Sequence, residues 1–192
     1  TVASGVTLTI ASGVEVHASS DSLVVNGILD ASNATFSGVY YTLSIIAGNG
    51  GQVDLNGSTL NNCRVTFQAG SSGAVSNTVF DSSSLLYIYS SNVTVSGCTL
   101  DEAYIYAGTP TITGNTFSSN YPIIITDPDL LLMAVSGNTY NGSEPKINIQ
   151  GTLDNSLEFG PVDGLDTYYL ANTFTVASGV TLTIASGVEV HA

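Results

Sequence analysis

The sequence predicts an all-β protein, a right-handed parallel β-helix whose chain winds into a solenoid of about eight or nine coils of roughly 20 residues each. Three observations support this prediction. Short octets recur at the spacing of one coil, each octet carries Gly or Asn at the same place, and helical periodicity is almost absent. Five prolines are spread along the chain. Because proline interrupts helices, no long apolar helix fits between them.

Six octets form the short repeat, and their last residues lie 17 to 24 positions apart. They are LDASNATF (29–36), VDLNGSTL (53–60), GAVSNTVF (73–80), VTVSGCTL (93–100), PTITGNTF (110–117) and MAVSGNTY (133–140). This spacing is shorter than the ~30 residues of a strand–helix–strand unit, so it indicates coils of strands with loops of variable length. The third and last positions are apolar in every octet, which predicts two buried columns along the solenoid axis.

The seventh octet position is threonine in five octets and valine, Val79, in the octet 73–80. It is one residue from a buried position, so it lies on the opposite face of the strand and predicts an outward row of threonines. The fifth position holds residue types that enter the left-handed backbone region at least cost, which predicts a corner of the coil. The corner residues are Asn33, Gly57, Asn77, Gly97, Gly114 and Gly137.

A much longer repeat frames the chain: residues 1–18, TVASGVTLTIASGVEVHA, recur unchanged as residues 175–192. Structural periodicity constrains residue class but lets outward positions vary, so an exact copy indicates a tandem array. We therefore expect one module, residues 1–174, followed by the start of the next identical module in the same solenoid. The alternative is a duplication that appends the first strand as a cap. The chain starts in the middle of this pattern, and we expect a fragment of a longer or processed polypeptide.

The charge balance restricts the partners. Fifteen Asp and Glu residues stand against two basic residues, Arg64 and Lys146, for a net charge of −13. Such a chain cannot neutralise a phosphate backbone, so nucleic acid and anionic membranes are unsuitable partners. The apolar run 130–135 ends at Ser136 and is too short to cross a bilayer. Abundant neutral hydroxyls and amides are typical of secreted and cell-surface β-proteins, so we expect an extracellular location.

Cys63 and Cys98 are the only cysteines. Two are too few for a disulfide scaffold, so we expect buried thiols, with a disulfide within or between chains as the alternative. Four sequons offer acceptors for N-glycosylation, although such triplets arise easily by chance in a chain rich in Ser, Thr and Asn. The acceptors are Asn33, Asn56, Asn92 and Asn141.

The octets, two of which end in Gly-Asn-Thr followed by Phe or Tyr, and the opening residues 1–32 resemble known proteins. The octets are similar to the coil signature of right-handed β-helix proteins with the pectin-lyase-like fold. The opening segment, TVASGVTLTIASGVEVHASSDSLVVNGILDAS, resembles the first coils of large secreted β-helix repeat proteins and adhesins of bacteria and archaea. The resemblance covers nearly the whole chain. It implies a fold and not an activity, because this solenoid hosts lyases, hydrolases, adhesins and structural proteins alike.

The resemblance also implies what an enzyme would need. Lyases of this fold use an Arg or Lys base beside Ca²⁺-binding Asp residues, and the hydrolases use grouped Asp residues with His and basic residues. Arg64 and Lys146 are about four coils apart, which separates them by about 20 Å at ~4.8 Å per coil. His17 and its copy His191 have no nucleophile placed by a recognisable motif. We therefore expect no catalytic residue and no enzyme.

Acidic pairs in loops are the remaining place for chemistry. Hard cations need about six to eight oxygens, and no pair supplies that number locally. Solvated carboxylates are therefore the simplest interpretation, and no cofactor is expected. If one site binds Ca²⁺, we favour the turn of Asp127 and Asp129, because Pro128 holds both side chains in a tight loop.

The exact repeat favours a structural role, as a repeat of an extracellular filament, sheath or stalk in which identical modules associate end to end. A cell-surface adhesin or carbohydrate-binding stalk is the alternative, and a polysaccharide-active enzyme is a remote third. Eight tyrosines offer a stacking surface for surface glycans or for neighbouring filaments: Tyr40, Tyr41, Tyr87, Tyr89, Tyr104, Tyr106, Tyr168 and Tyr169. Tyr87 with Tyr89, and Tyr104 with Tyr106, form two pairs on successive coils, each pair on one face of its strand.

Overall fold

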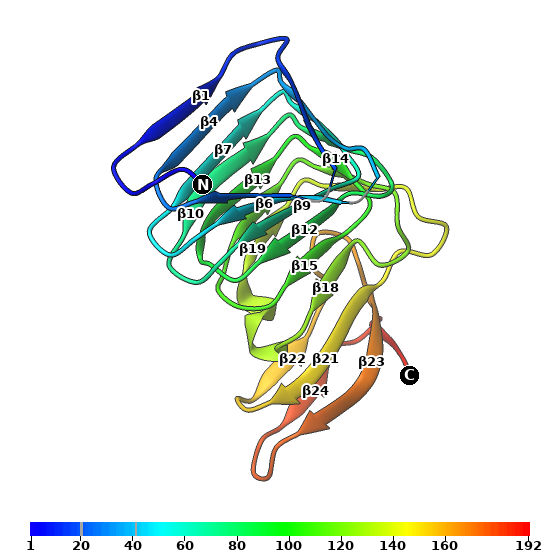
Figure 1. Cartoon of the computed structure of the whole chain (residues 1–192). Helices are drawn as coiled ribbons and strands as arrows, with labels where there is room; N and C mark the ends of the chain where they lie inside the picture. Colours follow the sequence, from blue (N-terminus) through cyan, green and yellow to red (C-terminus); the bar gives the residue numbers. More distant parts are fainter. Residues whose placement is uncertain (20, 41) are drawn as a thin grey trace.

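The computed structural model describes residues 1–19, 21–40 and 42–192 and confirms an all-β solenoid (Figure 1). Strands make up 54% of the chain and follow one another in about 9 turns of ~21 residues. Neighbouring strands of the stack pair in parallel, as successive coils of a solenoid must. Within the described ranges, no helix is long and apolar enough to cross a membrane.

Three long parallel sheets form the walls, because each regular coil adds one strand to each sheet. Sheet 1 contains β1 (Thr7–Ile10), β4 (Ile28–Ser32), β7 (Gln52–Asn56), β10 (Ser72–Ser76), β13 (Asn92–Ser96), β16 (Thr111–Thr113) and β19 (Ala134–Ser136). Sheet 2 contains β2 (Glu15–Ala18), β5 (Thr35–Gly38), β8 (Thr59–Asn61), β11 (Val79–Phe80), β14 (Thr99–Leu100), β17 (Thr116–Phe117) and β20 (Thr139–Tyr140).

Sheet 3 contains β3 (Ser22–Val25), β6 (Leu43–Ala47), β9 (Cys63–Phe67), β12 (Leu85–Ile88), β15 (Ala103–Ile105), β18 (Ile123–Ile125), β21 (Ile147–Leu153), β23 (Thr167–Val176) and β25 (Glu189–His191). Sheet 4 pairs β22 (Leu157–Phe159) with β24 (Leu182–Ile184). A short 3-10 helix, η1 (Pro128–Leu132), lies between β18 and β19.

The two predicted apolar columns line the interior. On sheet 1, Leu55 of β7 is in register with Val75 of β10, Val75 is in register with Val95 of β13, and all three are buried. The last octet residues stack in the same way along sheet 2. Only in the octet 133–140 are both column residues partly exposed. The threonines stack in register on the outer face of sheet 2, where Val79, 46% exposed, interrupts the row as predicted.

The predicted corner is also confirmed. All six corner residues have positive φ angles, between 50° and 67°. At Gly57 the close approach of the neighbouring coil adds a second constraint, since a Cβ atom there would lie 2.4 Å from Oδ1 of Asn33. Asparagine and glycine therefore occupy this corner because other residues would strain the backbone.

The sixth octet position turns inward at this corner and builds a ladder of hydrogen bonds along the axis. The backbone amide of this residue lies outside the strands and has no partner in a sheet. It donates instead to a side-chain acceptor of the next coil. The Cys98 amide donates to Oδ1 of Asn115 at 2.9 Å, and the Asn115 amide donates to Oδ1 of Asn138 at 2.8 Å. The Nδ2 groups of these two asparagines donate back to the carbonyl oxygens of Val95 and Ile112 in the preceding coil.

Asp163 closes the ladder at its C-terminal end. Its carboxylate accepts hydrogen bonds from the amides of Gly137 and Asn138, at 2.7 Å and 2.9 Å, and from the Tyr140 hydroxyl at 3.0 Å. Partial burial alone would raise the pKa of Asp163, but the hydrogen bonds outweigh it and hold this pKa below its usual range. The carboxylate is therefore stabilised in its charged form.

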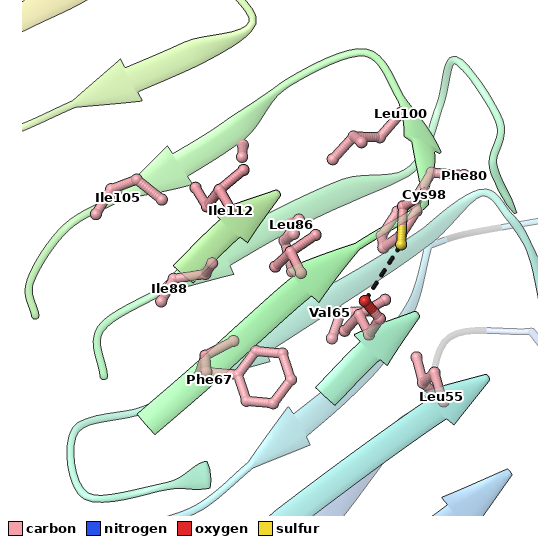
Figure 2. Packing of buried hydrophobic residues seen from close by; sticks show 14 of the residues in the cluster. Leu55, Val65, Phe67, Phe80, Leu86, Ile88, Cys98, Leu100, Ile105 and Ile112 are labelled. Atoms are coloured by element: carbon pink, nitrogen blue, oxygen red, sulfur yellow. Dashed lines mark hydrogen bonds between the residues drawn. The ribbon is translucent and has the colours of Figure 1, made fainter. Parts of the chain in front are cut away.

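Side chains from all three sheets meet in one continuous core. Figure 2 shows Leu55 and Ile112 from sheet 1, Leu100 from sheet 2, and Phe67 and Leu86 from sheet 3 pointing into the same interior. Burial of such side chains contributes about 1.5–3 kcal/mol each relative to an exposed position. The core therefore runs without interruption along the stack and holds the coils together.

The prediction of buried, unpaired thiols is confirmed. Cys63 and Cys98 are both free and buried. The thiol of Cys98 donates to the carbonyl oxygen of Val75 at 3.3 Å (Figure 2). Burial raises the pKa of the Cys63 thiol to about 11. Both cysteines therefore act as small core residues.

The C-terminal part departs from the regular three-sheet pattern. Sheet 2 ends at β20, while β21 and β23 are long strands that pair over two stretches, with a register shift between Ile149 and Gly151. The chain then adds β24 to β22 in sheet 4, and β25 to the first half of β23 in sheet 3. Figure 1 shows these strands in yellow, orange and red at the end of the stack.

The two copies of the 18-residue segment consequently occupy different sheets. Residues 7–10 and 15–18 form β1 and β2, which pair with β4 and β5 in sheets 1 and 2. The corresponding strands of the second copy, β24 and β25, lie in sheets 4 and 3. The second copy stays stacked on the preceding coil, but its strands pair in other sheets than those of the first copy.

Candidate functional site: a tyrosine cluster on sheet 3

The four tyrosines predicted as two pairs form one contiguous group on the outer face of sheet 3, which we call the tyrosine cluster: Tyr87, Tyr89, Tyr104 and Tyr106. Tyr87 of β12 is in register with Tyr104 of β15. Tyr87 points outward because its neighbour Leu86 is fully buried, and adjacent strand residues lie on opposite faces. Tyr89 and Tyr106 directly follow these strands.

The rings of the cluster pack against one another. The Tyr87 ring lies edge-on to Tyr104 and Tyr106, with centroids 5.0 Å and 5.7 Å away and interplanar angles of 82° and 83°. Tyr89 stacks on Tyr106 at 4.6 Å with an angle of 10°. Each such pair contributes about 0.5–1.5 kcal/mol beyond its buried area, so the cluster is a preorganised piece of surface.

Charged and polar groups border the cluster. The guanidinium carbon of Arg64 lies 5.3 Å from the Tyr87 ring centroid, within the range of a cation–π interaction. The Tyr104 hydroxyl donates to Oε2 of Glu102 at 2.6 Å, and the Ser119 hydroxyl donates to Oε1 of Glu102 at 2.8 Å. Partial burial and the Glu102 carboxylate raise the pKa of Tyr104. This phenol therefore stays protonated and acts as a hydrogen-bond donor.

A shallow cleft of about 380 Å³ adjoins the cluster, lined by Thr66, Gln68, Ala69 and Tyr89. Tyr89 is 36% exposed, so part of its ring is available to a ligand. The lining combines an aromatic ring with a hydroxyl and an amide. Such a set binds by stacking and hydrogen bonding, and these four residues contain no acid–base pair that would support catalysis.

Three further tyrosines lie outside the cluster. Tyr40 is exposed on the loop between β5 and β6. Tyr41 lies outside the described residues. Tyr169 is on the outer side of β23, and its ring centroid lies 5.4 Å from that of Tyr121. Of the eight predicted tyrosines, the four of the cluster are linked to one another by ring contacts.

The prediction that Tyr168 belongs to a stacking surface is wrong. Tyr168 is fully buried, stacks on Phe159 at 4.5 Å, and donates its hydroxyl to the carbonyl oxygen of Gly160 at 2.5 Å. It takes the inward position of β23, in register with the buried Ile147. Burial raises the pKa of Tyr168 to about 12. Alternation along the strand places only one residue of a tyrosine pair outside.

Both carboxylates of the predicted calcium turn accept hydrogen bonds from groups of the protein. Asp127 caps η1, since its side chain accepts from the Asp129 amide at 3.0 Å. The Asp129 carboxylate accepts from the amide and the Nδ2 of Asn155, at 3.2 Å and 2.9 Å. Among the described residues, no group of three or more His, Cys, Asp or Glu is placed to hold a metal ion. Calcium binding at this turn stays a prediction.

The cationic groups are distributed over different coils. Arg64 is on β9, and Lys146 precedes β21, four strands further along sheet 3. Lys146 pairs with Glu144 at 2.8 Å. His17 and His191 each contact the glutamate two residues before them, at 3.2 Å and 3.4 Å. The structure therefore keeps Arg64 away from Lys146, whereas Lys146 and His191 line the same hollow.

A second hollow of about 380 Å³ lies where the second copy of the 18-residue segment meets the preceding coils. Its acidic and basic lining residues are Glu144, Lys146, Asp166 and Glu189, and His191 also lines it. The hydrogen bond between Lys146 and Glu144 raises the pKa of the amine and holds the pKa of this carboxylate below its usual range. The ion pair with Glu144 thus engages the lysine of the hollow.

All four predicted glycosylation acceptors, Asn33, Asn56, Asn92 and Asn141, are exposed. Asn33 stands at the corner of its coil, where its positive φ angle depends on the side chain being asparagine or glycine. Exposure is a requirement for modification, and glycosylation itself stays a prediction.

The polar partners of the tyrosine cluster, Arg64, Glu102 and Ser119, escaped the sequence analysis. The signal that would find Arg64 is the register between coils. Arg64 lies beside Leu85, two residues before Tyr87 on the neighbouring strand, so it is diagonal to that ring. Register depends on loop length, which varies from coil to coil in this chain.

Comparisons with protein-family models, with curated proteins and with solved structures gave no match to this chain. The functional proposal below therefore rests on the residues of the chain and their arrangement.

Proposed function

We propose that the chain is a non-enzymatic structural repeat of an extracellular filament, sheath or stalk, in which identical modules stack end to end into one β-solenoid. The supporting observation is the 18-residue segment that occurs unchanged at both ends of the stack. The second copy packs on the preceding coil through β24 and β25, as a further turn would. Exposed strand edges at the end of a solenoid need a partner, and a following module supplies one.

The bonding along the axis suits such a role. Backbone pairing links every coil to the next, and the ladder at the sixth octet position adds side-chain bonds as far as Asp163. The net charge of −13 makes the rods repel one another and favours solubility over unspecific bundling. Within this proposal, the chain belongs among secreted or cell-surface β-helix proteins of bacteria or archaea with the pectin-lyase-like fold.

The test is a chain of two fused modules, residues 1–174 followed by residues 1–192. Electron microscopy and small-angle scattering are expected to show one rod about twice as long as a single module. A matched control carries a flexible Gly–Ser linker at the junction and should give two separately tumbling rods. Two globules in the fused chain without the linker would contradict the proposal.

A carbohydrate-binding stalk is the second candidate, and the cleft beside Tyr89 favours it. Sugar rings present apolar faces that stack on aromatic rings, and their hydroxyls bond to groups such as those of Thr66 and Gln68. The same surface also suits lateral packing between filaments, because exposed aromatic patches serve either purpose.

A glycan array separates these two uses of the tyrosine cluster. If it binds sugar, Tyr89→Ala should lower glycan affinity more than about tenfold, and Tyr87→Ala and Tyr104→Ala should also weaken it by disturbing the packed rings. Tyr40→Ala, an exposed tyrosine outside the cluster, is the control and should bind unchanged. Loss of filament bundling without any glycan signal would instead indicate lateral packing.

A further inference from the structure

The two copies of the 18-residue segment have the same sequence, but they are covered from opposite sides. In the first copy, Val2 and Ile10 are 5% and 8% exposed. Their counterparts in the second copy, Val176 and Ile184, are 39% and 42% exposed. Side chains that one copy buries are therefore open in the other.

The reverse holds for other side chains of the segment. Leu8 and Val14 are exposed in the first copy, whereas their counterparts Leu182 and Val188 pack against the core. Each copy thus has half of the surroundings of an interior coil. A single segment of this sequence that packed on β22 and β23 on one side and on β4 and β5 on the other would have both sides covered.

The first copy is held mainly by its backbone. β1 pairs with β4 and β2 pairs with β5 over their full lengths. The amide of Ile28 donates to the carbonyl oxygen of Val6 at 2.9 Å, and the amide of Thr35 donates to that of Val14 at 3.0 Å. Since the two copies are identical in sequence, the coil of residues 22–38 can form the same backbone hydrogen bonds with either of them.

The second copy leaves its outer edge free for this coil. β24 and β25 pair with β22 and β23 on their inner edges. In the part of the chain that the structure describes, no strand pairs with their outer edges. The segment can therefore accept a further coil while it stays attached to its own chain.

We propose that residues 175–192 of one copy of this chain bind the coil formed by residues 22–38 of a second copy, in place of that copy's residues 1–18. The inference rests on the proposed end-to-end stacking and names its partner and its mechanism. Every backbone bond that residues 1–18 give up is remade by an identical sequence. The exchange joins two stacks into one, with a single segment at the junction.

The exchange is favourable because it removes two half-covered ends at once. Val176 and Ile184 of the first chain become covered by the coil of the second, and the open side of Leu8 is replaced by Leu182, which is already packed. The displaced residues 1–18 regain conformational freedom. The process is slow, because β1 and β2 must first separate from β4 and β5.

Two full-length variants test the exchange. Ile10→Asp places a charge at a buried position, in register with Ala31, and should loosen residues 1–18. It is expected to increase end-to-end assembly more than about tenfold over the wild-type chain, seen by light scattering and as lengthening rods in electron micrographs. Adding Ile184→Asp, at an already exposed position, should return the protein to monomers, since the incoming segment then carries the charge.

A peptide of sequence TVASGVTLTIASGVEVHA should compete with residues 175–192 and stop the assembly of the Ile10→Asp variant. The matched peptide with Asp in place of its isoleucine should not. Equal assembly of the double variant, or equal inhibition by both peptides, would overturn the proposal, because both would indicate unspecific association.

The wild-type chain supplies a second measurement if Ile10→Asp proves unfolded by circular dichroism. A fluorescent form of the 18-residue peptide should bind the wild-type chain slowly, and absence of binding would overturn the exchange. This failure is distinct from failure of the proposed function. A fused two-module chain that is one rod, with separate chains that never exchange, refutes the exchange alone.

Discussion

At the scale of single residues, the backbone amide next to each corner needs a hydrogen-bond acceptor, and the side chain at the sixth octet position of the next coil can supply it. The sixth octet position is Ala34, Ser58, Thr78, Cys98, Asn115 or Asn138. These residues differ in size and polarity. The backbone amide bonds to a side chain of the next coil at five of the six positions, namely Ala34, Ser58, Cys98, Asn115 and Asn138. The Ala34 amide donates to Oγ of Ser58 at 3.3 Å, whereas the Cys98 amide donates to Oδ1 of Asn115 at 2.9 Å. Asparagine bonds most completely, because its Oδ1 accepts from the preceding coil and its Nδ2 also donates to that coil.

Asn115→Ala should be strongly destabilising. The change leaves the buried Cys98 amide and the Val95 carbonyl without their partners. We expect a loss of about 2–4 kcal/mol in the free energy of unfolding, measured by urea denaturation. Asn92→Ala, at an exposed position, is the control and should stay within about 0.5 kcal/mol of the wild type. Equal losses in the two variants would show that the ladder carries no stability.

Asp163 predicts a pH dependence of stability. Its hydrogen bonds hold the pKa of the folded carboxyl group below that of the unfolded chain. A lowered pKa stabilises the fold above the unfolded pKa of about 3.9, and this stabilisation disappears as the pH falls through the folded pKa. The stability difference between wild type and Asp163→Asn should therefore be largest near neutral pH and shrink below about pH 4.

The measurement is thermal or urea unfolding of both proteins across this pH range. Asp154→Asn removes an exposed loop carboxylate and is the matched control, with a smaller difference expected at neutral pH. A difference between Asp163→Asn and wild type that stays constant from neutral to acid pH would contradict the role of the charge.

At the scale of elements, each coil is a set of short strands joined at corners, and the corners set the path of the chain. The strands of sheet 2 are two to four residues long, and the left-handed corner directly precedes them. Such short strands have little stability by themselves. Their order comes from the neighbouring coils and from a corner residue that turns without strain.

Gly114 tests the corner by itself. Its φ is 65°, and a Cβ atom would find no other atom closer than 4.0 Å, so there is room for a side chain. Gly114→Ala should cost about 1–2 kcal/mol from backbone strain alone. Gly114→Asn should cost less, because asparagine already occupies this corner in two other coils, at Asn33 and Asn77. Unfolding free energies of the two variants decide, and equal costs would contradict the conformational argument.

At the scale of the whole molecule, the solenoid changes its walls along its length. Sheet 2 ends at β20, Asp163 closes the corner ladder, and the lengthened β21 and β23 take over two sides of the last coils. The second copy of the repeated segment therefore places β25 on sheet 3, where the first copy placed β2 on sheet 2. The repeat is exact in sequence, but its two copies pair in different sheets.

This change of sheet predicts a rotation between fused modules. Sheet 3 of the first module should continue as sheet 2 of the second, because β25 occupies the place that β2 has at the start of a module. The tyrosine clusters of successive modules should then lie on different sides of the rod. Electron cryomicroscopy of the fused chain measures this directly. Clusters aligned along one side would contradict the rotation.

Much of this architecture could be predicted from residue types alone. The fifth octet position needs a left-handed backbone, and residues such as Asn77 and Gly97 indicate this conformation because they adopt it at least cost. Column residues such as Val75 and Val95 are recognisable because alternation makes one face apolar. Tyr87 and Tyr104 were placed on one outer face for the same reason. These predictions use local chemistry, which is the same in every coil.

Residue types and their order are enough to predict the coil, with its length, its corner, its buried columns and the exact recurrence of residues 1–18. Contacts between coils set how the coils pair where loops vary in length. These contacts bury Tyr168 and bring Arg64 within cation–π range of Tyr87. They also end the corner ladder at Asp163 and pair the strands of the second copy in other sheets. The physical reason is register, since a shift of one residue turns a side chain to the opposite face, and register is set by contacts between distant parts of the chain.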